Sequence, residues 1–455
     1  EIHEQIANKG LLEENILLGN ALVDMYAKCG SLEESQRVFD KIPIQDVVSW
    51  NVLISAYVDH GLAQEAMECM EKMYDEGSIP LDAITTTCSL KACGSLQTIS
   101  KSRDIHCELV KKGFENEGIV GNTLIDMYVK CNSLIEAYYI FDKLEIRDIV
   151  AWNTILTAYG ERAFGEDAWN CFKEMKSAGV SPNYISFVCA LKACSSERVA
   201  KRGQSLHIEI MKQGLEVNIV VGNTLVDMYA KCGLLSESWE TFMGLSIHDV
   251  VTWNAVIAGY AERKLSEEVE NCFKSMQLEG VFPDALTYIF VLKSCCEPGT
   301  LGRGQKFHAE VVKDGFELNF HVASCLVVLY AKCGELAEAQ EVFDTMGARD
   351  VVTWTALIAG YAEHGSSKEA LNCFQRMCME SVSPNAFTYV SGLRACSKLS
   401  IIHKGQAFHS EIAKKGYETD AYICSALVDM YCKCGFLTKA QIIFDKLSIR
   451  DSVSW

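Results

Sequence analysis

The chain repeats itself at a period of 101 or 102 residues, and this self-similarity constrains its fold more than any other feature. Five tryptophans mark the period: Trp50, Trp152, Trp253, Trp354 and Trp455, separated by 102, 101, 101 and 101 residues. The neighbouring residues also recur, as in "DVVSWNVLISAY" from Asp46 and "DVVTWTALIAGY" from Asp350. A fixed period of this kind is the signature of repeat proteins, whose units stack in series.

Each long period divides into three shorter units. In the third copy these units cover 219–249, 250–284 and 285–319, with lengths of 31, 35 and 35 residues. The same division predicts thirteen complete repeats: 16–46, 47–82, 83–117, 118–148, 149–183, 184–218, 219–249, 250–284, 285–319, 320–350, 351–385, 386–420 and 421–451. Residues 1–15 then belong to a preceding long repeat, and residues 452–455 begin a further one.

Two helices are predicted in each unit. In 16–46, an apolar stripe from Ala21 to Cys29 has helical spacing, "CGS" breaks the chain, and a second stripe runs from Leu32 to Ile42. Prolines close the middle units, where a helix must stop, and no strand pattern persists. A helical pair this short cannot bury its apolar face alone. We therefore expect an all-α fold, a right-handed superhelical α-solenoid of about 26 helices.

Composition excludes several other classes of protein. The net charge of −18 disfavours a general basic coat for nucleic acid, although it does not describe any one groove. No apolar run approaches the roughly 18–20 residues that cross a membrane. Most of the 21 cysteines recur once per repeat, which suits packing thiols in a reducing compartment. The first residues show no targeting character, and because both ends fall within repeats, we interpret the chain as a piece of a longer protein.

Units of 31 and 35 residues cycling in threes, with the words "DMYAKCG", "VVTWN" and "LKAC", resemble the pentatricopeptide repeat family. They are most similar to its plant subclass of alternating short, standard and long repeats. The resemblance implies binding of single-stranded organellar RNA, one nucleotide per repeat, at sites of C-to-U editing. It also implies a location in mitochondria or chloroplasts. Editing members usually carry a further C-terminal region, so any deaminase domain is expected beyond Trp455 and this chain is not predicted to be an enzyme.

In this family two positions of each repeat face a base: one early in the first helix, and the last residue of the repeat. In the short and standard repeats, the first positions are Asn20, Asn51, Asn122, Asn153, Asn223, Asn254, Ser324, Thr355 and Ser425. The last positions are Asp46, Asp82, Asp148, Asn183, Asp249, Asp284, Asp350, Asn385 and Asp451. Every first position is Asn, Ser or Thr, and every last position is Asp or Asn.

The chemistry of these residues suits the reading of bases. Uracil and guanine present a ring N–H, which an acceptor-only carboxylate can bind, whereas cytosine and adenine present a ring acceptor, which suits an amide donor. Short Ser or Thr leaves room for a purine, and longer Asn fits a pyrimidine. An alternative is helix capping, which Asp and Asn also perform, and which accounts for the last positions but not for the first.

Further residues follow from the resemblance or from spacing. Apolar wedges between bases match Val48, Val150, Val251 and Val352. Five lysines lie two turns beyond the base-reading residue and are candidates for phosphate contacts, with a solvated lysine as the alternative: Lys28, Lys130, Lys231, Lys332 and Lys433. The long repeats differ, with Thr87, Val188, Ile289 and Val390 first and Glu117, Asn218, Asn319 and Asp420 last. We expect these repeats to act as spacers or to dock other editing factors.

The sequence also contains residues that imitate an active site. The H-x-E of zinc deaminases occurs once per long repeat, at His106, His207, His308 and His409, but without a C-x-x-C. Cys432 and Cys434 offer only two ligands, so neither a metal nor a cofactor is predicted. A protein-binding scaffold of tetratricopeptide type is the alternative function, disfavoured by the unequal repeat lengths and the confined polar positions.

Overall fold

The computed structural model describes residues 15–446 except 76–81, 114–117, 163 and 298. Within these residues it contains twenty-six α-helices, one 3₁₀ turn and no strand, as predicted. The chain divides into two compact units, at 1–232 and 233–455.

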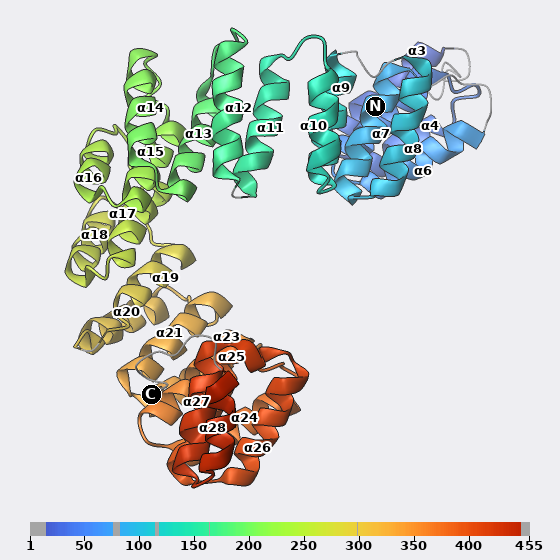
Figure 1. The fold of residues 1–455 in the computed structure, drawn as a ribbon. Helices are drawn as coiled ribbons and strands as arrows, with labels where there is room; N and C mark the ends of the chain where they lie inside the picture. Colours follow the sequence, from blue (N-terminus) through green and yellow to red (C-terminus); the bar gives the residue numbers. More distant parts are fainter. Residues whose placement is uncertain (1–14, 76–81, 114–117, 163, 298, 447–455) are drawn as a thin grey trace. The chain divides into compact units, whose positions relative to one another are not determined.

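In the first unit, helices lie side by side in the order of the chain (Figure 1). They are α3 (Ile16–Lys28), α4 (Leu32–Phe39), α5 (Val47–Asp59), α6 (Ala63–Asp75), α7 (Ala83–Leu96), α8 (Ile99–Lys112), α9 (Gly118–Lys130), α10 (Leu134–Lys143), α11 (Ile149–Glu161), α12 (Gly165–Ser177), α13 (Tyr184–Glu197), α14 (Ala200–Lys212) and α15 (Ile219–Cys232). Within this unit, from α3 to α13, the first helix of each repeat packs on its own second helix and on the first helix of the next repeat.

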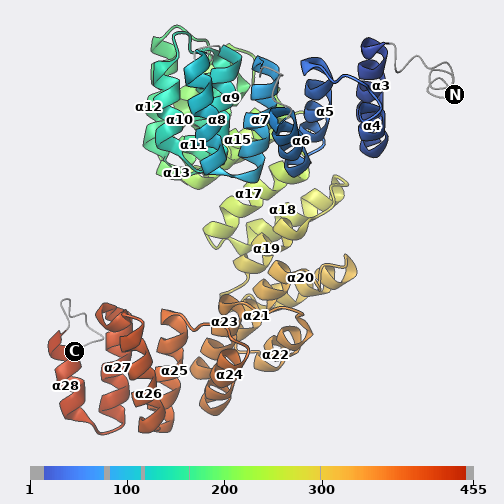
Figure 2. The same ribbon diagram turned by 90° about the vertical axis from the view of Figure 1, so that its right-hand side faces the viewer.

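The second unit is built in the same way (Figure 2). Its helices are α16 (Leu235–Met243), α17 (Val250–Glu262), α18 (Ser266–Leu278), α19 (Ala285–Ser294), α20 (Leu301–Lys313), α21 (Phe320–Cys333), α22 (Leu336–Thr345), α23 (Val351–Glu363), α24 (Ser367–Met379), α25 (Ala386–Leu399), α26 (Ile402–Lys414), α27 (Ala421–Lys433) and α28 (Leu437–Lys446), with the 3₁₀ turn η1 at Tyr417–Thr419. Within each unit, the first helices therefore form a continuous layer of their own.

The repeated tryptophan is the centre of each described junction between a short repeat and the standard repeat that follows it. Trp50, Trp152, Trp253 and Trp354 are all at most 3% exposed. Each meets a phenylalanine of the preceding second helix edge to face, with ring centroids 4.6–4.7 Å apart, as in Phe39–Trp50 and Phe343–Trp354. Such aromatic pairs bury a large apolar area in a defined geometry. They fix how a short repeat meets the standard repeat that follows it.

The break in "KCG" also has a local cause. Gly30, Gly233, Gly334 and Gly435 take left-handed φ values of 77°, 82°, 85° and 81°. At the equivalent place in "KCN", Asn132 has φ 63°, the conformation that Asn tolerates better than most residues. The chain therefore turns from the first to the second helix at the same point in each of these repeats.

Candidate nucleic-acid interface

The last residue of a repeat is the N-cap of the next first helix. An Oδ1 of Asp82, Asp284 or Asp350 accepts the backbone N–H three residues on at 2.8 Å. Asn183 and Asn385 do the same through their amide oxygens, at 3.1 and 3.0 Å. The capping role considered from the sequence is thus present at each of these positions. It occupies one oxygen and leaves the other side of the carboxylate or amide available.

First and last positions meet although about 30 residues separate them in sequence. Asn51 Nδ2 donates to both carboxylate oxygens of Asp82, at 3.1 and 2.9 Å. The other direct contacts are Asn122 to Asp148 at 3.1 Å, Asn153 to Asn183 at 3.1 Å and Asn254 to Asp284 at 3.0 Å. The structure thus brings together these four predicted pairs by direct hydrogen bonds.

The remaining pairs are arranged differently. The amide of Asn20 is buried and makes no hydrogen bond to Asp46 or to any other described residue. Ser324 and Thr355 are too short to reach Asp350 and Asn385, and each bonds instead to a threonine hydroxyl, of Thr353 or Thr388, that also contacts the last residue. Asn223 and Asp249 belong to different compact units. Ser425 lies in the first half of α27, while Asp451, like Glu117, lies outside the described residues.

Several carboxylates of the site are held in their charged form. Burial alone would raise the pKa of Asp82, but hydrogen bonds from the backbone and side chain of Thr85 and from Asn51 outweigh it and lower the pKa. The same balance lowers the pKa of Asp284, through Thr287 and Asn254, and that of Asp46, through the backbone and side chain of Ser49. These side chains are therefore acceptors at neutral pH.

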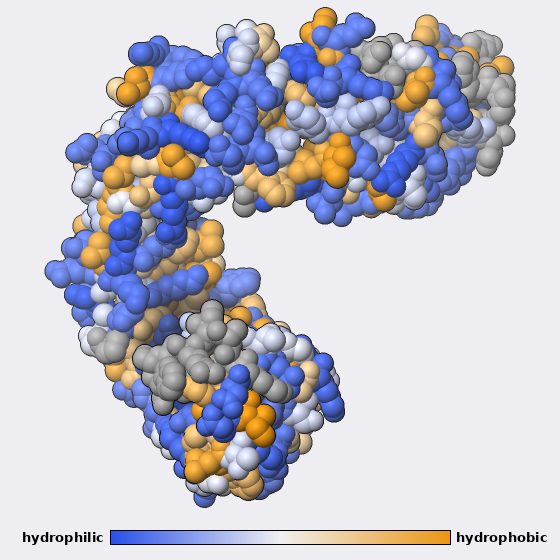
Figure 3. Space-filling model, in the orientation of Figure 1, coloured by the Kyte–Doolittle hydropathy of each residue, from blue (hydrophilic) through white to orange (hydrophobic). Residues whose placement is uncertain are grey.

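Exposed apolar side chains precede the first positions. The expected wedges Val48, Val150, Val251 and Val352 are 50–56% exposed although they are aliphatic. These valines lie three residues before the first position of their repeats. Exposed apolar residues at the same place in other repeats were not predicted from the sequence. There the exposed residues are Leu17, Ile84, Ile119, Val220, Leu286, Phe387 and Tyr422. The constant offset of three residues was the signal that could have found them. On the face seen in Figure 3, apolar patches interrupt a mainly hydrophilic surface.

Four of the five candidate phosphate lysines form ion pairs within their own helix. Each pairs with the Asp four residues earlier, in the partners Lys28–Asp24, Lys130–Asp126, Lys231–Asp227 and Lys433–Asp429, at 2.7–2.9 Å. Lys332 is exposed and has Val328 at that place, and in the described part of the chain it has no ion pair. These aspartates were not predicted to matter from the sequence. They offset the positive charge of four of the five candidate lysines.

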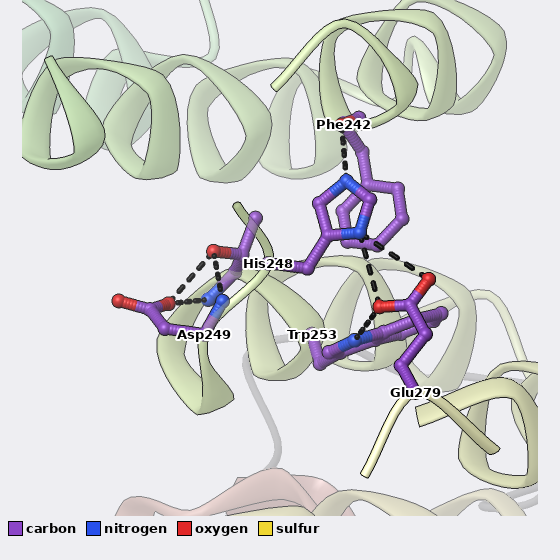
Figure 4. A network of polar contacts seen from close by, with 6 residues as sticks. Phe242, His248, Asp249, Trp253 and Glu279 are labelled. Carbon is purple, nitrogen blue, oxygen red and sulfur yellow. Dashed lines mark hydrogen bonds and ion pairs between the residues drawn. The ribbon is translucent and has the colours of Figure 1, made fainter. Parts of the chain in front are cut away.

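The residue just before the last position ties neighbouring repeats together. In Figure 4, His248 lies between α16 and the loop after α18: its Nε2 is 3.0 Å from the Phe242 carbonyl oxygen and its Nδ1 is 3.1 Å from Glu279 Oε2. The imidazole also stacks on the Phe242 ring at 4.0 Å. Glu279 accepts the indole N–H of Trp253 at 3.2 Å as well. This network fixes the backbone at Asp249, whose side chain caps α17.

Arginine occupies the equivalent position in three other short repeats, at Arg147, Arg349 and Arg450, the last of which lies outside the described residues. Arg147 and Arg349 donate Nε–H to the carbonyl oxygens of Phe141 and Phe343, at 3.0 and 3.2 Å. These residues could not be selected from the sequence alone, because their role depends on a backbone carbonyl group six residues earlier.

The four H-x-E histidines are spread over four junctions and do not meet. Each ring nitrogen Nδ1 is 2.8–2.9 Å from a tyrosine hydroxyl of the next first helix, in the pairs His106–Tyr128, His207–Tyr229, His308–Tyr330 and His409–Tyr431. Among the described residues no three His, Cys, Asp or Glu side chains are placed to hold a metal ion. In the same part of the chain, no helix is long and apolar enough to span a membrane.

The stacked helical pairs and their paired polar positions define a helical-repeat protein. Residues 45–95, 147–196, 248–297 and 349–398 match the PPR repeat family. The PPR repeat also matches residues 20–44, 122–149, 223–245, 322–351 and 422–450. Because these matches cover more than half of the chain, the chain belongs to the pentatricopeptide repeat family.

Similar proteins occur in Arabidopsis thaliana. The chloroplastic pentatricopeptide repeat-containing protein At4g18520 is 34% identical over 97% of this chain and 72% of its own length. The mitochondrial protein At3g09040 is 32% identical over 100% of this chain and 44% of its own length. The chain spans about half the length of several further relatives.

The fold is also similar to a solved structure. The crystal structure of the pentatricopeptide repeat protein PPR10, in complex with an 18-nt psaJ RNA element, matches with a TM-score of 0.68 at 18% identity. The match covers 99% of this chain and 72% of that chain. At this identity the likeness supports the α-solenoid fold.

Proposed function

We propose that this chain binds single-stranded RNA sequence-specifically, one base per short or standard repeat. The observation that carries the proposal is the recurrence of the first and last positions as contacting polar pairs beside an exposed apolar residue. Asn51, Asp82 and Val48 form one such set. A base could stack on the apolar side chain while its Watson–Crick edge meets the pair.

The biological role follows from the family. The repeats at 16–46 through 421–451 would select a C-to-U editing site in an organellar transcript, as in the subclass of alternating short, standard and long repeats. PPR10 was crystallised with RNA, and relatives carry chloroplastic or mitochondrial names, which supports RNA and an organelle. The long repeats place Val188 and Ile289 at the first position, which cannot hydrogen-bond a base, and would space the RNA or dock other editing factors.

The residue pairs assign a base to each short and standard repeat. With the N-terminus toward the 5′ end of the RNA, Asn with Asp reads U, Asn153 with Asn183 reads C or U, Ser with Asp reads G, and Thr355 with Asn385 reads A. The site is 5′-UUnUYnUUnGAnG-3′, with the long repeats left open.

Competition binding tests the proposal. The chain should bind an RNA carrying this site at least about tenfold more tightly than a scrambled RNA of the same composition, since single-base mismatches cost on the order of 1–3 kcal/mol each. Equal affinity for both RNAs would overturn sequence-specific binding. Binding of neither RNA, with capture of a protein partner instead, would favour the scaffold alternative.

A further inference from the structure

A third side chain takes part in five of the predicted pairs. The third residue of the following first helix carries a hydroxyl in most repeats: Ser49, Thr85, Ser186, Thr252, Thr287, Thr353 and Thr388. All seven are fully buried, at 0% exposure. Because this residue belongs to the next repeat, each base-facing pair is completed by a group that lies beyond the repeat itself.

In three repeats whose first position is Asn, at 47–82, 149–183 and 250–284, the hydroxyl orients the amide of that Asn. Thr85 Oγ1 donates to Asn51 Oδ1 at 2.5 Å, Ser186 to Asn153 at 2.6 Å and Thr287 to Asn254 at 2.7 Å. The same hydroxyls lie farther, at 2.9, 3.1 and 2.9 Å, from Oδ1 of the last residue, so the single hydroxyl proton is directed to the nearer acceptor, the first position. With the amide oxygen bound on that side, Nδ2 faces the last residue. An amide nitrogen has two hydrogens, and the last residue takes one of them. The other makes the first position a donor toward a base.

Where the first position is Ser or Thr, the hydroxyl has the opposite effect. Thr353 Oγ1 lies 2.5 Å from Asp350 Oδ1, and a carboxylate only accepts, so the threonine proton goes to Asp350. The 3.1 Å contact between Ser324 and Thr353 must then be donated by Ser324. Since its only proton is used, Ser324 offers lone pairs toward a base.

In the repeat at 351–385 the first position likewise donates its proton to the third-residue hydroxyl. Asn385 Oδ1 accepts the Thr388 backbone N–H at 3.0 Å, which identifies that atom as the oxygen, and it also accepts the Thr388 hydroxyl at 2.9 Å. Thr355 therefore donates across its 2.7 Å contact to Thr388. Thr355 is left as an acceptor, and the Asn385 amide nitrogen remains as a donor.

We propose that this buried third-residue hydroxyl is a further specificity-determining position, which sets whether the first position donates or accepts. The proposal rests on the proposed RNA-binding function and deepens it. Asn–Asp presents a donor and an acceptor, which complements an oxygen and the N3–H of uracil. Asn–Asn presents two donors, for O2 and N3 of cytosine. Ser–Asp presents two acceptors, for N1–H and N2–H of guanine, and Thr–Asn an acceptor and a donor, for N6–H and N1 of adenine.

One repeat provides a natural comparison. Ala151 stands at the third position after Asp148, so among the described residues no hydroxyl of this kind reaches Asn122. There Asn122 Nδ2 is 3.1 Å from both oxygens of Asp148, which alone orient the amide. The repeat at 118–148 should consequently discriminate less than the Asn–Asp repeats at 47–82 and 250–284, where the hydroxyl contacts the first position.

The experiment compares Thr388→Val with Thr388→Ser. Valine keeps the shape but removes the hydroxyl, whereas serine keeps the hydroxyl. Competition binding uses RNAs that carry the site 5′-UUnUYnUUnGAnG-3′ and differ only at the base opposite 351–385. The wild type and T388S should prefer A, and T388V should lose about tenfold of that preference, the scale of one hydrogen-bonded base contact. In both variants, discrimination at the base opposite 250–284 should stay as in the wild type. T388S should also keep the wild-type melting temperature.

The outcomes separate the two proposals. A wild type without base preference anywhere would overturn the proposed function. A wild type that prefers A, with T388V keeping the full preference, would overturn only the role of the hydroxyl. Ala151→Ser gives a second test that does not remove a buried group: it should sharpen the preference for U over C opposite 118–148 several-fold. An unchanged ratio in A151S would contradict the inference.

Discussion

At the residue scale, Asp82 shows how one carboxylate can hold a helix and face a ligand together. Its Oδ1 accepts the Thr85 backbone N–H at 2.8 Å, and Asn51 donates to both oxygens. The cap fixes the carboxylate, so a base that binds it would meet a group already ordered in the free protein. Preorganisation of this kind lowers the entropic cost of binding.

The last position of the repeat at 351–385 allows a direct test of base reading. Asn385→Asp keeps the cap but replaces a donor amide by an acceptor carboxylate. With Thr355 unchanged, the preference should move from A to G, by about 1–3 kcal/mol for a matched against a mismatched base. Competition binding with RNAs that differ only at that nucleotide measures the change.

A long repeat supplies the matched control. Asn218 also caps the next helix, accepting the Val220 and Val221 N–H groups at 3.0 and 3.2 Å, but its first position is Val188. Asn218→Asp makes the same chemical change, and it should leave base preference at every nucleotide as it was. Retained preference for A in N385D would refute the assignment.

Sequence reasoning identified the paired positions because they vary within a constant frame, but it could not supply their hydrogen bonds. The first and last positions of the short and standard repeats stood out as Asn, Ser, Thr or Asp, and in the standard repeats the first position directly follows the recurring tryptophan. Thr85 and Ser186 did not stand out, because Ser and Thr are unremarkable in the first turn of a helix. Their role depends on side chains 33 or 34 residues earlier, which only the packing of successive repeats brings near.

At the scale of helices, the apolar stripes in the sequence were sufficient to predict the two helices of each repeat. The stripe from Leu32 to Ile42 corresponds to α4, and the aromatic contact of Phe39 with Trp50 shows why it must be apolar. The connections between repeats were not predictable in the same way. His248 and Arg349 bind backbone carbonyl groups, which carry no sequence signal.

A histidine–tyrosine contact joins the second helix of each long repeat to the next first helix, and it should make stability depend on pH. Burial lowers the pKa of His308, and Glu341 opposes this only in part. The unfolded chain therefore binds more protons than the folded chain between the ordinary value of about 6.5 and the lowered value. Stability is lost as the pH falls through this window.

The variant His308→Gln tests this dependence. Glutamine keeps a polar group beside Tyr330 but does not titrate, so the decrease in melting temperature from pH 7.5 to pH 5.5 should be smaller in H308Q than in the wild type. His403 is exposed, and His403→Gln should retain the wild-type decrease. If H308Q and H403Q behave alike, the buried contact does not carry the pH dependence.

At the scale of the whole molecule, the net charge of −18 sets a condition on how RNA is bound. Long-range attraction to a polyanion requires positive charge, and here most candidate lysines are paired with aspartates on their own helices. Affinity should then come mainly from contacts to bases, added repeat by repeat as in other solenoid proteins. The salt dependence of binding measures the balance between the two contributions.

Five free lysines on phosphates would give a slope of log K against log salt of about −3.5, at roughly −0.7 for each contact on a single strand. Because four of the five are offset by aspartates, we expect a slope of about −1, to which Lys332 contributes most. Lys332→Gln should make the slope shallower by about 0.7, while Lys231→Gln, which removes a charge already paired with Asp227, should change it little. Titration of RNA binding from about 50 to 200 mM salt measures these slopes. A wild-type slope near −3.5, or equal effects of K332Q and K231Q, would show that the aspartates do not neutralise the groove and that the lysines bind phosphates as an equivalent set.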